Sequence, residues 1–275
     1  MKLSERLIAK NRRGDPTAHE LEAVLDAVYA AFAFRERWPL AADEFTPSIQ
    51  DWMLGDGLID DLVGTLRTQA RRPAIERGAE AAGETTHLCV ADAAGNVVAL
   101  TQSIQSLYGA KVAHPSLGFF YNNYLTTCVR YRHPNRLAAG CIPRSNVSPA
   151  IILDKDGSPR LAVGAAGSRR IVSATLQVIR RVLAGGEILS DAIAAPRGHA
   201  LLNGKAWVEE PSLSKALRAS LAGRYRQVIA RKTHDYKMGC VQAISWDGDG
   251  KISAAADPRR DGTGTVLPHS KAEGR

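Results

Sequence analysis

The sequence lacks any apolar run long enough to cross a lipid bilayer. A membrane-spanning helix needs about 18 or more consecutive apolar residues, and the 275 residues contain no such run. Residues 1–6 are charged and have no apolar core, so they do not resemble a secretion signal. We therefore expect no membrane span and no signal peptide in this chain, and the location of the protein stays open.

Cysteines are few and far apart. Cys89, Cys128, Cys141 and Cys240 show no C-x-x-C spacing, which is the spacing typical of structural zinc sites. We therefore expect no metal, and no motif indicates an organic cofactor. Cys89 falls in an apolar strand pattern and is interpreted as a small buried residue. The positions neither require nor exclude disulfides.

Positive charge is in excess but is not concentrated. The net charge is +8, yet the basic residues are scattered among acidic ones, with isolated pairs at Arg71-Arg72 and Arg259-Arg260. A nucleic-acid surface is typically a basic stripe or patch, often with aromatic side chains among its charges. Aromatic residues make up only 6% of this chain and no such stripe is visible, so we expect no nucleic-acid partner.

The first 70 residues have the periodicity of helices. Apolar residues recur at helical spacing over residues 18–38. Thr46-Pro47 is typical of a helix start and predicts a short helix through Leu54, and residues 59–70 predict a third helix. Residues 1–16 are charged and are expected to be loosely held. A linker of mostly small residues is expected at 72–84.

Hairpins and helices are predicted after this linker. Residues 86–92 with 96–104, and 149–153 with 160–163, flank turns that contain glycine, which is typical of β-hairpins. A short strand is expected at 118–123. Further predicted helices lie at 169–183, near 190 and at 212–222, and further strands at 206–209, 239–245 and 251–256. This order predicts an α+β fold or layered sandwich rather than a doubly wound parallel sheet.

Thr85 lies where the linker meets the first predicted strand. If the Glu84–Thr85 peptide bond were cut, Thr85 would carry a free α-amino group beside its hydroxyl, so that one residue would supply both nucleophile and base. Threonine is also common in strands, so the local sequence fits an ordinary strand residue equally well. His87 is interpreted as a structural strand residue rather than a catalytic base.

Six segments, taken in order, resemble the γ-glutamyltranspeptidase family of N-terminal-nucleophile hydrolases. They are residues 85–101, 118–123, 143–149, 164–169, 195–197 and 256–259. The resemblance covers residues 85–275, and the 191 residues that follow Glu84 (275 − 84) match the size of that family's small subunit. It implies two parts: residues 1–84 as a helical C-terminal remnant of the large subunit with its linker, and residues 85–275 as the catalytic small-subunit-like part.

The resemblance also implies a fold, an activity and a partner. The implied fold is a four-layer αββα sandwich of the N-terminal-nucleophile type, incomplete in this chain. The implied activity is self-cleavage before Thr85, then hydrolysis or acyl transfer through an acyl-enzyme on γ-glutamyl or related amides and peptides. The missing large-subunit segment, or a second polypeptide, is the expected partner. The alternative is an inactive fragment or a structural or partner subunit of such an enzyme.

Eight residues are assigned to the site by this resemblance. Thr85 would be the nucleophile, and Ser103 would orient its hydroxyl or amine. Gly167 and Ser168 would offer backbone N–H groups to the oxyanion. The acyl pocket would be lined by polar side chains: Gln105, Thr127, Ser145 and Asn146.

Each assignment has a plainer alternative. Ser103 fits a solvent-facing strand serine equally well. Residues 164–168 also fit a turn before a helix, and residues 145–146 fit an ordinary polar loop.

Three departures from the family pattern concern the substrate. Residues 124–127 contain no carboxylate where the family reads the glutamyl amino group, and a neutral threonine cannot pair with an ammonium as an acid can. Gln105 stands where the family has asparagine, and Ser168 where it has a second glycine. The family arginine that grips the glutamyl carboxylate belongs to the N-terminal part of the large subunit, which this sequence does not contain.

Overall fold

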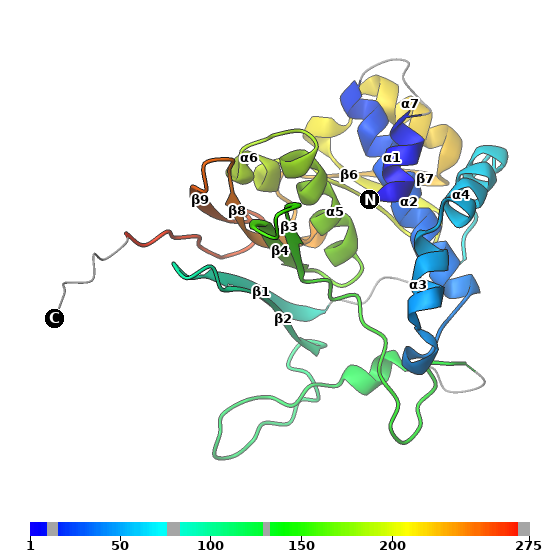
Figure 1. Cartoon of the computed structure of the whole chain (residues 1–275). Helices are drawn as coiled ribbons and strands as arrows, with labels where there is room; N and C mark the ends of the chain where they lie inside the picture. The colour runs from blue at the N-terminus through cyan, green and yellow to red at the C-terminus, as the bar shows by residue number, and fades with distance from the viewer. Residues whose placement is uncertain (10–15, 76–82, 129–132, 269–275) are drawn as a thin grey trace.

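The structure is a computed structural model that describes residues 1–9, 16–75, 83–128 and 133–268. Helices and strands are mixed along the chain, so the fold is α+β (Figure 1). Most of the expected linker, residues 76–82, lies outside the described residues.

The described N-terminal residues contain four α-helices: α1 (Lys2–Ala9), α2 (Pro16–Arg37), α3 (Pro47–Leu54) and α4 (Asp56–Thr68). The expected cap of α3 is confirmed, because the Thr46 hydroxyl accepts a hydrogen bond from the Ile49 backbone N–H. Helix α4 begins at Asp56 rather than at Ile59, since Gly55 alone separates it from α3. None of the described helices is long and apolar enough to cross a bilayer.

The expectation of a loosely held N-terminus was wrong for residues 2–9, while residues 10–15 lie outside the described residues. Leu3 and Ser4 are buried, and Leu7 packs against the same core one turn later. An eight-residue helix is marginal alone in water, so packing against α2 and α4 is what stabilises α1. Its short sequence carries too little periodicity to reveal this.

Both predicted hairpins are present. Strand β1 (Glu84–Ala91) pairs with β2 (Val97–Gln105), and β3 (Ala150–Leu153) pairs with β4 (Pro159–Ala166). The second hairpin extends into a four-stranded antiparallel sheet through β8 (Cys240–Trp246) and β9 (Ile252–Ala256), in the order β3-β4-β8-β9.

The hairpin β1–β2 packs on one face of this sheet and helices cover the other. Alternate residues of β4 separate the two faces: Leu161 and Val163 belong to the apolar core shared with α5 (Arg170–Leu183), whereas Gly164 faces His87 of β1. Helix α6 (Leu189–Ala194) packs beside α5 over β8 and β9. Thr85 therefore lies on a strand that is pressed against the sheet from the side opposite α5.

A third sheet packs against the N-terminal helices. It contains β5 (Gly198–Ala200), β6 (Lys205–Glu209) and β7 (Gln227–Arg231), with β6 and β7 parallel and linked by α7 (Lys215–Arg224). Figure 1 shows α1, α2 and α4 beside this unit, and their apolar side chains share one core with it. β5 and β7 were not predicted, because each is short and gains its ladder only from β6.

The strand expected at residues 118–123 was not found. This stretch makes only an isolated bridge between Ala113 and Phe120, within a long segment that projects from the body between β2 and β3 (Figure 1). Gly118 has a φ of +69°, which turns the chain just before the aromatic residues.

Candidate active site

Thr85 and Ser103 lie directly opposite each other on the hairpin. The Thr85 Oγ1 hydroxyl donates a hydrogen bond to Ser103 Oγ at 2.9 Å. The strand register shifts between Glu84 and Thr85, so an irregularity of the ladder falls on the peptide bond expected to be cut. Bulges of this kind bend a strand and redirect a side chain, and they are frequent beside active sites.

Ser103 connects the Thr85 hydroxyl to the carbonyl that precedes it. Ser103 Oγ donates to the Glu84 carbonyl oxygen at 2.8 Å and accepts from the Gln105 backbone N–H at 3.1 Å. A hydroxyl hydrogen on a carbonyl oxygen polarises that carbonyl and stabilises negative charge developing on it. Ser103 is half-buried and hydrogen-bonded to Thr85, to Glu84 and to Gln105, so its hydroxyl does not simply face solvent.

A cavity of about 240 Å³ opens beside Thr85. It brings together six of the eight residues assigned from the sequence: Thr85, Gln105, Thr127, Ser145, Asn146 and Ser168. The other two assigned residues are adjacent to these six. Ser103 is hydrogen-bonded to Thr85, and Gly167 directly precedes Ser168 in the chain. The six residues come from five separate places in the sequence, so their convergence depends on the tertiary fold.

The Gly167–Ser168 turn has the backbone conformation that glycine favours. Gly167 has a φ of +136°, and a Cβ there would lie 2.9 Å from the Gly239 Cα. Ser168 has a φ of +58°, in the left-handed region that costs a non-glycine residue energy. Such strain clusters at functional sites. Serine therefore occupies this position with a glycine-like backbone, immediately before helix α5.

The polar residues of the opposite wall are held by one another. Ser145 Oγ lies 3.1 Å from the Tyr124 hydroxyl and accepts a hydrogen bond from the Val147 N–H. The Thr127 hydroxyl donates to the Tyr124 carbonyl, which ties it to its own short helical turn. Asn146 Oδ1 accepts from Arg35 Nη1 at 2.8 Å.

Two larger cavities lack this combination of groups. One of about 380 Å³ beside Asp26 and Arg72 has no serine, threonine or cysteine in its described lining. Another, of about 1340 Å³, lies between hairpin turns, where Asp92 and Asp247 accept backbone N–H groups of their own turns. Only the Thr85 cavity combines a hydrogen-bonded hydroxyl pair with a strained glycine-like turn among the described residues.

A model of the protein family described as gamma-glutamyltranspeptidase matches residues 4–267. The chain belongs to the gamma-glutamyltranspeptidase family. It is 34% identical over 199 residues to the acylase ACY 1 proenzyme of Pseudomonas sp. strain SE83, covering 69% of this chain and 33% of that protein. It is 30% identical over 248 residues to the mouse glutathione hydrolase 5 proenzyme, covering 84% of this chain and 42% of that protein.

Two solved structures are similar to this chain in fold. A gamma-glutamyltranspeptidase from Pseudomonas nitroreducens, complexed with L-DON, is 27% identical with a TM-score of 0.58, covering 66% of this chain and 100% of that chain. A cephalosporin acylase from Bacillus halodurans shares the fold at 20% identity, with a TM-score of 0.78 over 98% of this chain and 49% of that chain. The chain spans between about a third and two fifths of the curated relatives named above.

Three arginines of this family member were not assigned from the sequence, yet they line the cavity: Arg35, Arg144 and Arg169. Arg35 lies near the end of α2, and Arg144 pairs with Glu36 of the same helix end. Arg35 and Asn146, which are hydrogen-bonded to each other, are 111 residues apart in the sequence. The local sequence around either residue therefore does not predict this contact.

His87 lies between the hairpin and the sheet, not among the residues that line the cavity. Its ring hydrogen-bonds Thr101 Oγ1 and Cys89 Sγ and packs against Gly164. Burial lowers the pKa of His87 from 6.5 to about 4, so the ring is neutral near pH 7. Among the described residues, no cluster of histidine, cysteine, aspartate and glutamate is arranged to hold a metal ion.

Proposed function

We propose that this chain carries the catalytic machinery of a γ-glutamyltranspeptidase-type amide hydrolase or acyltransferase, released when the Glu84–Thr85 bond is cut. The observation that carries the proposal is the line of hydrogen bonds from Thr85 through Ser103 to the Glu84 carbonyl. Family membership and the proenzyme names of both curated relatives support it.

The proposed maturation uses the Thr85 hydroxyl as an internal nucleophile. Its oxygen attacks the Glu84 carbonyl carbon while Ser103 donates to the carbonyl oxygen. The C–N bond then breaks as the hydroxyl proton passes to the Thr85 nitrogen, which leaves an ester on Thr85 and a free Thr85 amine. Water hydrolyses the ester, giving a Glu84 carboxylate and a Thr85 with free hydroxyl and amine.

The mature site would then act on an external amide. The free α-amine of Thr85, whose ordinary pKa is about 7.7–8.0, accepts the hydroxyl proton as the oxygen attacks the substrate carbonyl. Backbone N–H groups at Gly167 and Ser168 stabilise the oxyanion. The leaving amine departs with that proton, and water or another amine releases the acyl group. The side chains of Gln105, Thr127, Ser145 and Asn146 line the acyl pocket.

The proposed complete fold is a four-layer αββα sandwich. The hairpin β1–β2, the sheet β3-β4-β8-β9 and the helices α5 and α6 would be three of its layers. The outer face of the hairpin is apolar and exposed at Leu88, Val90, Val98 and Leu100. A large-subunit segment or second polypeptide that adds the fourth layer would cover this face. Residues 1–84 and 85–275 would be separated by the cleavage while sharing one core.

The exposed hairpin face also favours a second candidate. A chain with so much uncovered apolar surface could serve as an inactive or structural partner subunit of a related enzyme. This candidate predicts a stable, uncut chain without turnover.

Intact mass with N-terminal sequencing of the purified chain tests the proposal. The proposal predicts a 191-residue species (275 − 84) that begins Thr-Thr-His. Thr85→Ala should remain uncut, and Ser103→Ala should slow cleavage by about 100-fold or more, the effect of losing one oxyanion donor. Thr86→Ala is the matched control, because Thr86 faces outward on the same strand and should be cut normally. A fully uncut wild-type chain, alone and mixed with a relative's large subunit, would contradict the proposal.

A further inference from the structure

Asn123, the last residue of the 118–123 motif, forms a clamp at the end of strand β2. Its Oδ1 accepts a hydrogen bond from the Ser106 backbone N–H at 3.1 Å, and its Nδ2 donates to Ser106 Oγ at 3.0 Å. Its own backbone N–H donates to the Ile104 carbonyl at 3.2 Å. The segment that projects from the body leaves β2 at this point (Figure 1), so the clamp ties the start of the projecting segment to the returning chain.

The residue between the two that Asn123 holds has a left-handed backbone. Gln105 has a φ of +75°, a conformation that costs a non-glycine residue energy. Strained conformations of this kind persist only where the surrounding structure enforces them. The clamp fixes Ile104 before Gln105 and Ser106 after it, so it provides that enforcement.

The left-handed turn at Gln105 belongs to the strand irregularity at the expected cleavage site. In the ladder, Glu84 lies opposite Gln105. The next residue of β1, Thr85, lies opposite Ser103, so Ile104 is the extra residue of a bulge on β2. From this bulge the Gln105 N–H donates to Ser103 Oγ, whose own hydrogen lies on the Glu84 carbonyl oxygen. The shape of the bulge therefore sets the position of the Ser103 hydroxyl.

We propose that Asn123 is a positioning residue for cleavage of the Glu84–Thr85 bond. By holding the bulge, it keeps Ser103 Oγ where this one hydroxyl meets both the attacking Thr85 oxygen and the Glu84 carbonyl. Asn123 is not among the described residues that line the cavity, so it acts through Ser103 and not on an acyl group. The inference rests on the proposed function, because it requires self-cleavage before Thr85.

The rate of cleavage tests this role. The chain is made by cell-free translation, and its conversion to the 191-residue species (275 − 84) is followed by intact mass. Asn123→Ala should be cut about tenfold to a hundredfold more slowly, since small misplacements of reacting groups cost rate factors of this order. Asn122→Ala is the matched control and should be cut at the wild-type rate, because Asn122 is exposed and bonds the Tyr124 N–H of its own turn. Equal rates for the two variants would overturn the proposal.

Double variants separate positioning from a loss of folding. Glycine adopts a φ of +75° without strain, so Gln105→Gly should restore most of the cleavage rate that Asn123→Ala loses. Asn123→Ala should not slow Ser103→Ala further, because both changes remove the same contact. A residue that only stabilised the fold would show neither effect. Independent, additive losses in these combinations would therefore overturn the proposal.

Amide hydrogen exchange, measured by NMR, separates this inference from the proposed function. In the uncut Thr85→Ala background, adding Asn123→Ala should speed exchange of the Gln105 N–H about tenfold or more, because its bond to Ser103 opens. Faster exchange in a protein whose wild-type chain is never cut would reject self-cleavage and leave the clamp standing. Unchanged exchange would overturn the inference, even if the wild-type chain is cut normally.

Discussion

Replacing Glu209 by glutamine should strongly destabilise the protein, because this carboxylate neutralises a buried arginine. Glu209 is fully buried at the end of β6. Its Oε1 accepts from Arg259 Nε at 2.9 Å and from the Asp235 backbone N–H at 2.9 Å. Its Oε2 accepts from Arg259 Nη2 at 2.5 Å and from the Arg197 backbone N–H at 2.8 Å. Each of the two carboxylate oxygens of Glu209 therefore accepts two hydrogen bonds.

The size of the loss follows from that geometry. Either orientation of the amide leaves its NH₂ group facing two donors, so two hydrogen bonds are lost. One of these involves a charged donor, and bonds of that kind contribute about 1.5–3 kcal/mol each. The change also leaves Arg259 with Asp257 as its only described carboxylate partner. Removing one member of a buried ion pair typically costs about 3–5 kcal/mol, and we expect Glu209→Gln to fall in this range.

Urea unfolding followed by circular dichroism measures this free energy. The midpoint should fall while the slope stays constant, which assigns the change to stability rather than to compactness. Glu210→Gln is the matched control, since Glu210 is the next residue and is exposed; it should change the free energy by less than about 0.5 kcal/mol. If the unfolding free energy of Glu209→Gln lies within about 1 kcal/mol of the wild-type value, this network of buried charges does not stabilise the fold.

Three further predictions concern other parts of the molecule. Burial lowers the pKa of His87 from 6.5 to about 4, so only the unfolded chain gains a proton between these values; the unfolding free energy should fall as pH drops through this window, and His87→Gln should flatten that dependence. Gly164→Ala would place a Cβ 2.3 Å from the His87 ring and should cost about 1–3 kcal/mol in urea unfolding. Gly64→Ala, in helix α4 with open space around it, should instead stabilise by up to about 1 kcal/mol. The Cys128 and Cys141 sulfurs lie 3.8 Å apart, so a low-molecular-weight disulfide should oxidise them to a bridge; intact mass should show the loss of two hydrogens, and Cys128→Ser should prevent it.

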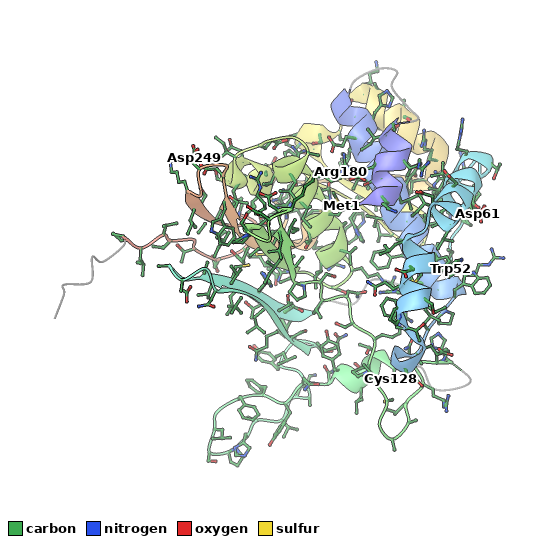
Figure 2. The ribbon with its side chains drawn as sticks, in the orientation of Figure 1. Met1, Trp52, Asp61, Cys128, Arg180 and Asp249 are labelled. Carbon is green, nitrogen blue, oxygen red and sulfur yellow. The ribbon has the colours of Figure 1, made fainter. Side chains whose placement is uncertain are left out.

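The Cys128–Cys141 prediction also bears on the cavity. Figure 2 shows Cys128 on the segment between β2 and β3, far from Asp249 in the β8–β9 turn. Cys128 follows Thr127, and Cys141 precedes the segment that contains Ser145. A bridge would therefore join two walls of the Thr85 cavity. Finding both thiols still free after oxidation, by alkylation and mass spectrometry, would show that the two segments do not approach in solution.

Local periodicity in the sequence determined much of the secondary structure. The hairpin β1–β2 was predicted because alternation and a glycine turn act within about twenty residues. Helices α2, α3 and α5 were predicted from helical spacing and from the Thr46 cap. The ordered motifs also identified the family, which the match over residues 4–267 confirms. The proposed site residues were named from the same motifs.

Only the tertiary structure decided what lies around Thr85. The short elements α1, β5 and β7 exist because distant partners complete their cores and ladders, so their own sequences could not reveal them. The arginines of the cavity wall are brought to Thr85 by packing between α2 and a segment more than a hundred residues later. Periodicity reports which face of an element is buried, but not which element covers it. The arginines that line the cavity beside Thr85 therefore had to be found in three dimensions.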